Sequence, residues 1–233
     1  MALAAAAMGL GATVQATIGF GQALVATPLL LLIDPKLVPG PATVAGIALS
    51  LVVVVRERSQ IRVLGLRWAV LGLLPGTALA AVAVAVLPAT GLAVLAALMI
   101  LAGIAASLAG LQVAPTARSL SVAGLVSGFM GTSAAVSGPP MALVYQRVPG
   151  PALRATLARF FLAASGLTIV ALVPAGKLGR HAVFAGLVMV PGVLVGFGCS
   201  RLLIGRVDRG FTRVAVLAVS AVSALAVLAR TLL

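Results

Sequence analysis

Carboxylates are scarce in this sequence. Its 233 residues include three acidic residues, Asp34, Glu57 and Asp208, all in segments that are expected to be loops. The single histidine, His181, lies at an expected helix start. No Ser/His/Asp set and no paired carboxylates are present, so we predict that the protein is not an enzyme. The lack of carboxylates in the apolar segments also argues against a cation transporter, a metal site and an Asp/Glu proton relay.

Cysteine is almost absent as well. Cys199 is the only cysteine, which excludes a disulfide within the chain and a thiolate metal cluster. It lies in an apolar run, so we expect it to be a packing residue. We therefore predict neither a metal nor a cofactor.

Charged residues make up only 8% of the chain, against about 25% in a typical soluble domain. Apolar residues make up 62%, and the mean hydropathy is +1.27. The apolar runs are about 20 residues long and lack a two-residue alternation. We predict an all-α polytopic protein of the lipid bilayer. The net charge of +13 comes from basic residues scattered between the apolar runs, which is typical of helix flanks and not of nucleic-acid binding.

Two of the expected apolar elements contain breaks. The elements are expected at 2–33, 38–55, 68–87, 91–111, 119–146, 155–173, 181–200 and 210–232. The first is interrupted by Gly19-Phe20-Gly21. The fifth contains residues 127–140, with three glycines, four hydroxyls and the adjacent Pro139 and Pro140. Irregular backbone at membrane depth survives only where it is buried in protein or lines a cavity, so we expect the two breaks to face each other and form a substrate site.

The order of these features repeats. A shift of 112 residues places Gly19 on Gly131 and Pro28 on Pro140, which indicates two repeats at 1–111 and 119–233 with a linker at 112–118. If every element crosses once, the 16 Lys and Arg residues divide eight to eight. If each broken element returns to its own side, twelve lie on one side, at 56–67, 118, 147–159 and 201–213. The positive-inside rule favours the second arrangement.

The predicted fold is therefore a pair of inverted repeats. Each repeat has one broken element, either a re-entrant hairpin or two half-length pieces, and three transmembrane helices. The basic side is expected to be cytoplasmic. The glycines at 72, 76, 192 and 196, with the prolines at 75 and 191, are expected to be packing and kink positions.

A site without carboxylates, with free helix N–H groups and small hydroxyls, suits an anion. The candidate binding residues are Gln15, Thr17, Gly19, Phe20, Gly21 and Gln22 in the first break, and Gly131, Thr132, Ser133, Ser137, Gly138 and Pro139 in the second. Arg159 is a further candidate, although it can also extend to the cytoplasmic interface. Arg154 is expected to be interfacial. Close helix packing is the alternative explanation for the glycines.

The residues at the breaks resemble the sulfite exporter TauE/SafE family of bacterial permeases. The resemblance rests on residues 19–30, which end in a Pro-Leu pair, and on residues 128–146, which contain Gly138-Pro139-Pro140. Gln22 departs from the first signature, where another glycine is common. The resemblance implies a multi-pass permease of the bacterial inner membrane that moves sulfite, organosulfonates or similar small anions.

Export is the favoured direction, because an inside-negative potential drives an anion outwards by roughly 2.3 kcal/mol per charge per 100 mV. The alternative is a non-transporting accessory subunit of a larger membrane assembly. The small size of the chain and its many packing glycines motivate this alternative.

Overall fold

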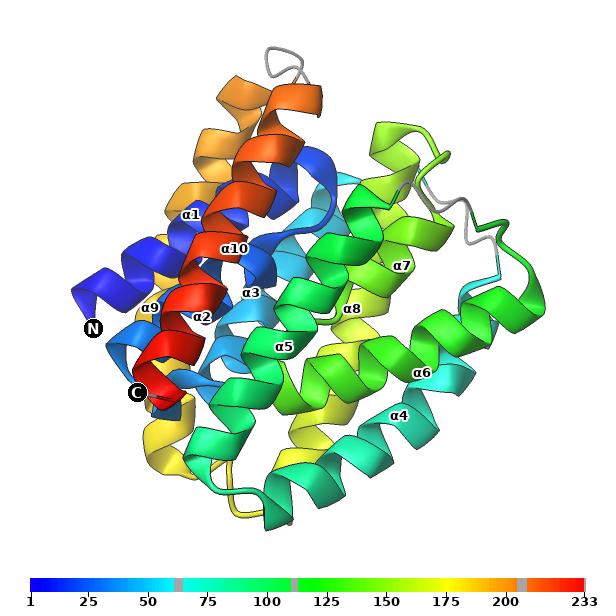
Figure 1. Cartoon of the computed structure of the whole chain (residues 1–233). Helices are drawn as coiled ribbons and strands as arrows, with labels where there is room; N and C mark the ends of the chain where they lie inside the picture. The colour runs from blue at the N-terminus through cyan, green and yellow to red at the C-terminus, as the bar shows by residue number, and fades with distance from the viewer. Residues whose placement is uncertain (61–64, 110–112, 205–208, 233) are drawn as a thin grey trace.

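The structure is a computed structural model that describes residues 1–60, 65–109, 113–204 and 209–232, and every regular element in these ranges is helical (Figure 1). Asp208 lies outside the described residues. The elements are α1 (Ala2–Ile18), α2 (Gln22–Ile33), the 3-10 helix η1 (Pro35–Leu37), α3 (Gly40–Arg56), α4 (Leu66–Val86), α5 (Ala89–Leu108), α6 (Ala117–Ala134), α7 (Gly138–Val144), α8 (Gly150–Leu172), α9 (Arg180–Leu203) and α10 (Arg209–Leu232).

Helix lengths and composition agree with a membrane protein. Within the described ranges, four helical segments are long and apolar enough to cross a bilayer: Leu66–Val86, Ala89–Ala106, Gly150–Leu172 and Arg180–Leu203. Shorter apolar helices cover Ala2–Ile18, Gln22–Ile33, Gly40–Arg56 and Ala221–Thr231. The predicted all-α class is confirmed.

Both expected breaks divide a helix in two. The first separates α1 from α2 at residues 19–21, where Gly19 has φ 105° and Gly21 has φ 110°. Only glycine adopts such angles at little cost, so the chain can turn sharply here. The second break is narrower than expected. Helix α6 continues through Gly131, and the turn occupies 135–137, with Ala135 at φ 59°. Pro139 and Pro140 then lie in the first turn of α7, where a missing N–H costs little.

Each long helix of one half of the chain packs against a helix of the other half. Helix α1 lies along α9, and α6 lies along α4; α3 packs on α8, and α5 packs on α10 (Figure 1). The expected packing glycines lie at the first two contacts. A Cβ atom at residue 72 or 76 would meet the backbone of α6, and one at residue 192 or 196 would meet the backbone of α1. The packing prediction for these four glycines is confirmed.

Three positions differ from the sequence-based expectation. Helix α8 begins at Gly150 and not at residue 155, because Pro151 is favoured in a first helical turn. Arg154 therefore lies within a helix and is buried. Glu57, which was expected in a loop, is buried at the end of α3. Cys199, expected to pack inside, is exposed on α9.

Candidate functional site

A cavity of about 60 Å³ lies between the two breaks. By the same measure one water needs about 10–15 Å³, so this central cavity has room for a few non-hydrogen atoms only. Its lining residues are Met8, Gln15, Gly21, Gln22, Ala23, Leu24, Ala26, Thr27, Ala42, Thr43, Gly46, Ser50, Gly131, Ala135, Val136, Ser137, Gly138, Pro139, Phe161, Ser165 and Thr168. None of these described lining residues carries a charge, so the cavity is polar and neutral.

The start of α2 supplies donors to the central cavity. The N–H groups of Gln22, Ala23 and Leu24 belong to the first turn and have no acceptor within the helix. Gln15 Oε1 accepts the first of them at 3.4 Å, so the end of α1 caps the start of α2 across the break. Ala23 and Leu24 line the cavity. The positive end of the α2 dipole is therefore directed towards it.

Gln22 has the most unusual environment in the central cavity. Its side chain is 6% exposed, and its Oε1 lies close to Gly46 of α3. Its Nε2 has no hydrogen-bond partner within the part of the chain that the structure describes. An unpaired buried donor costs about 1–3 kcal/mol, and a bound acceptor would remove this cost.

The second break contributes one hydroxyl group and part of the wall of the central cavity. Ser137 Oγ lies directly against the Cα atom of Gly131, in the space that a side chain at that position would occupy. Because Pro139 and Pro140 have no N–H, the first turn of α7 offers fewer backbone donors than that of α2. Gly138 and Pro139 complete this wall of the cavity.

Sequence reasoning missed five hydroxyls that line the central cavity. They belong to α2, α3 and α8: Thr27, Thr43, Ser50, Ser165 and Thr168. Thr43 donates to Pro39 O at 2.9 Å, so its oxygen is oriented by its own helix. Single hydroxyls in regular apolar helices show no motif, and only the rotation of each helix brings them to one place.

The other candidates from the sequence lie outside the central cavity. Thr132 forms a 2.9 Å hydrogen bond with Thr168, and Ser133 donates to Phe129 O at 2.6 Å. Arg159 is half-buried and donates to Ala155 O at 2.9 Å on its own helix. These three side chains therefore support the helices around the cavity and do not line it.

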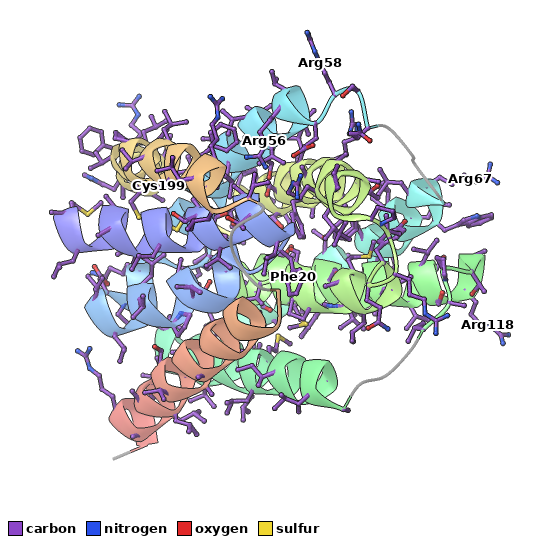
Figure 2. All side chains as sticks on the ribbon, turned by 90° about the horizontal axis from the view of Figure 1, so that it is seen from above. Phe20, Arg56, Arg58, Arg67, Arg118 and Cys199 are labelled. Carbon is purple, nitrogen blue, oxygen red and sulfur yellow. The ribbon has the colours of Figure 1, made fainter. Side chains whose placement is uncertain are left out.

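The remaining candidates of the first break lie on its far side. Thr17 and Phe20 line a second, larger cavity, and Gly19 packs against Leu153 and Arg154 of α8. Figure 2 shows Phe20 in the middle of the molecule, with Arg58, Arg67 and Arg118 at its margin. Of the 13 candidate residues, the structure brings seven to the central cavity: Gln15, Gly21, Gln22, Gly131, Ser137, Gly138 and Pro139.

An ion cluster holds the end of α1 beside the first break. Glu57 Oε1 accepts from Arg56 Nε at 3.1 Å and from Arg154 Nε at 2.8 Å. Arg56 Nη2 donates to Ala16 O at 2.6 Å, and Arg154 Nη1 donates to Thr17 O at 3.3 Å. These carbonyls are freed where α1 stops, and the two guanidinium groups satisfy them. The cluster therefore lowers the free-energy cost of ending α1 at this point in the fold.

The same cluster connects three helices at one end of the molecule. Arg56 Nη1 donates to Ser200 Oγ of α9 at 3.1 Å, and its guanidinium lies 4.8 Å from the centre of the Phe197 ring. Arg154 reaches the cluster from the start of α8. In the described residues no group of three His, Cys, Asp or Glu side chains is placed to hold a metal ion.

Comparison with known families agrees with this geometry. The family model described as sulfite exporter TauE/SafE matches residues 3–227, nearly the whole chain. The chain belongs to the TauE/SafE family. No curated protein and no solved structure matches it. TauE/SafE proteins are membrane transporters and not enzymes, which confirms both predictions for this chain. The family implies a membrane permease that exports sulfite or a related anion.

Proposed function

We propose that this TauE/SafE protein exports a small oxyanion, such as sulfite or a small organosulfonate, across the bacterial inner membrane, and that the ion binds in the central cavity. The observation that carries the proposal is the Gln22 amide, whose buried Nε2 lacks a partner among the described residues. Neutral donors and a helix N-terminus attract an anion, and no carboxylate lines the cavity to repel it. An inside-negative potential drives such an ion outwards without a coupling ion.

The proposed topology is a pair of inverted repeats, at 1–111 and 119–233. Helix α3 follows the first broken element, and α8 follows the second, so the two helices are equivalent in the repeats. The end of α3 meets the start of α8 in the Arg56–Glu57–Arg154 cluster, and the two packed helices therefore run in opposite directions. The cluster also reaches Ser200 of α9. A chain in which every element crosses once would place Arg56 on the opposite side of the membrane from Arg154, so the contacts support broken elements that return to their own side.

Reporter fusions test this topology. A reporter after residue 60 is expected to be cytoplasmic, as is one inserted in the segment 205–208. A reporter at the C-terminus is expected to lie outside the cytoplasm. A C-terminal reporter on the same side as the one after residue 60 would overturn the inverted arrangement.

Replacing Gln22 by leucine tests the binding site. Export of radiolabelled sulfite from proteoliposomes is expected to fall about tenfold or more, because a hydrogen bond to a charged group contributes about 1.5–3 kcal/mol. The free energy of unfolding is expected to stay the same or to rise, since the substitution removes an unpaired buried donor. This combination separates a binding role from a structural one.

Ser133→Ala is the matched control, because its hydroxyl is bonded to Phe129 O and lies off the cavity. Its flux is expected to equal that of the wild type. Wild-type flux in Gln22→Leu would remove the central cavity from the proposal. No flux by the purified wild-type protein, together with a stoichiometric partner that co-purifies, would favour the accessory-subunit alternative.

A further inference from the structure

A second cavity of about 570 Å³ lies next to the central one. Its described lining residues are Thr17, Ile18, Phe20, Leu24, Gly103, Pro139, Ala142, Leu143, Gln146, Val148, Gly150, Pro151, Leu153, Arg154, Leu203 and Ile204. They come from the end of α1, from α2, α5 and α7, from the start of α8, from the end of α9 and from the turns that follow α1 and α7. We call it the arginine-side cavity, because Arg154 is its only ionisable lining residue among those described.

A thin wall separates the two cavities. Leu24 and Pro139 line both of them. Phe20 lines only the arginine-side cavity, and its Cβ and Cδ2 atoms pack over Gly138, which lines the central cavity. Phe161 approaches Gly138 as well and lines the central cavity. Leu24, Pro139 and Phe20 therefore form part of the wall between the two cavities.

The arginine-side cavity differs in chemistry from the central cavity. Apolar side chains make up most of its described lining, and Arg154 carries its one guanidinium group. Glu57 Oε1 pairs with Arg154 Nε at 2.8 Å, and because Arg56 shares the same carboxylate, the cluster of these three residues keeps one net positive charge. Arg154 is 8% exposed, so little water screens it. Sites for organic ligands are typically about 300–1,000 Å³, mostly apolar, with a few polar groups that fix orientation. This cavity has that size and composition, whereas the central cavity does not.

We propose that the arginine-side cavity is a second binding site, and that it takes organic anions with an apolar body and a sulfonate or carboxylate head. The head lies at Arg154 and the body lies against Phe20, Leu143 and Leu203. The site lies on the side that carries most of the basic residues, so it collects anions before transport. This inference rests on the proposed export of small oxyanions through the central cavity. Anions too large for that cavity bind here, block export and are not carried.

Benzenesulfonate is the probe for this site. Calorimetric titration of the purified wild-type chain is expected to show binding of benzenesulfonate. Benzyl alcohol, which lacks the charge, is expected to have a Kd that is higher by about tenfold or more. In proteoliposomes, benzenesulfonate on the arginine side is expected to inhibit sulfite export competitively. Radiolabelled benzenesulfonate itself is expected to remain on that side.

Two substitutions, one on α7 and one on α9, fill the cavity. Leu143→Trp and Leu203→Trp are each expected to raise the Kd for benzenesulfonate about tenfold or more. Leu202→Trp is the matched control, because Leu202 is 67% exposed on the same helix as Leu203 and does not line the cavity. Its Kd is expected to be unchanged, and either filling variant alone is sufficient if the other fails to fold.

Gln22→Leu separates this site from the central one. Its Kd for benzenesulfonate is expected to remain within twofold of the wild type, although its sulfite flux falls. Loss of benzenesulfonate binding in Gln22→Leu, or unchanged binding in both filling variants, would overturn the second site. Transport of benzenesulfonate at the rate of sulfite would overturn the size restriction. Absence of sulfite flux with intact benzenesulfonate binding would instead contradict the proposed function.

Discussion

Replacing Glu57 by glutamine is expected to lower the free energy of unfolding by about 3–5 kcal/mol. Glu57 is 7% exposed and is the only carboxylate that the structure shows in an ion pair within the described residues. It accepts hydrogen bonds from Arg56 and Arg154. Glutamine preserves the shape of the side chain but leaves the buried Arg154 and the half-buried Arg56 facing each other with no compensating charge, and that arrangement is costly where little water is present.

The destabilisation by Glu57→Gln is expected to extend to the first break. Arg56 and Arg154 hold the carbonyls of Ala16 and Thr17, where α1 ends. Repulsion between the two arginines would move at least one of them away from its carbonyl. Thermal unfolding of the purified protein measures the effect, and a decrease in Tm on the order of 10 °C is expected for a chain of this size.

Asp34→Asn is the matched control for Glu57→Gln. This substitution also replaces a carboxylate by an amide, but Asp34 lies in an exposed turn, where the one hydrogen bond to its side chain from the described residues comes from the Lys36 N–H at 2.9 Å. Asparagine caps such turns as well as aspartate does, so the Tm is expected to change little. Equal Tm values for Glu57→Gln and Asp34→Asn would show that the cluster does not stabilise the break.

Replacing Gly196 by alanine is the second change with a large expected effect. A Cβ at this position would overlap the carbonyl oxygen of Gly9, where α9 crosses α1. Because the obstacle is backbone and not a flexible side chain, the two helices would have to move apart. Overpacking of this kind costs about 1–3 kcal/mol and more where nothing can shift, so we expect a loss of about 3 kcal/mol or more. Small residues at such crossings let helices approach in a membrane, where packing takes the place of the hydrophobic effect.

Gly198→Ala is the control on the same helix. Apart from its chain neighbours and the backbone of its own helix, no atom of the described residues lies within 4 Å of a Cβ built at Gly198. Alanine is favoured over glycine inside a helix by about 1 kcal/mol, so this variant is expected to be as stable as the wild type or slightly more stable. Thermal unfolding of the two variants side by side gives the comparison. If Gly196→Ala were the more stable of the two, the close contact between α1 and α9 would not be needed for the fold.

Much of the arrangement could be predicted from local sequence. Gly19 and Gly21 permit the first break, and Pro139 and Pro140 suit the start of α7, so both interruptions are visible in the chain itself. Gln15 and Gln22 are polar side chains next to one of them, and both line the central cavity. The breaks are confirmed, and they were predictable because backbone angles and helix ends depend on a few neighbouring residues.

The rest of the site could not be predicted in this way. Ser165 and Thr168 line the central cavity from α8, while Ser133 lies off it although it is close to the second break in sequence. Which face of a regular helix a hydroxyl occupies relative to the site depends on how that helix packs against its neighbours. Glu57 was expected in a loop, and only the approach of α8 to the end of α3 buries it between two arginines.

By itself, the sequence determined that this is a helical membrane protein with two broken helices and no carboxylate in its expected apolar elements, because composition, glycine and proline act locally. The tertiary structure decided that a small neutral cavity lies between the breaks. It also decided that a larger cavity with a buried arginine lies beside it. The physical reason is that cavities and buried charges arise from the rotation and crossing of distant helices, and no local pattern encodes those.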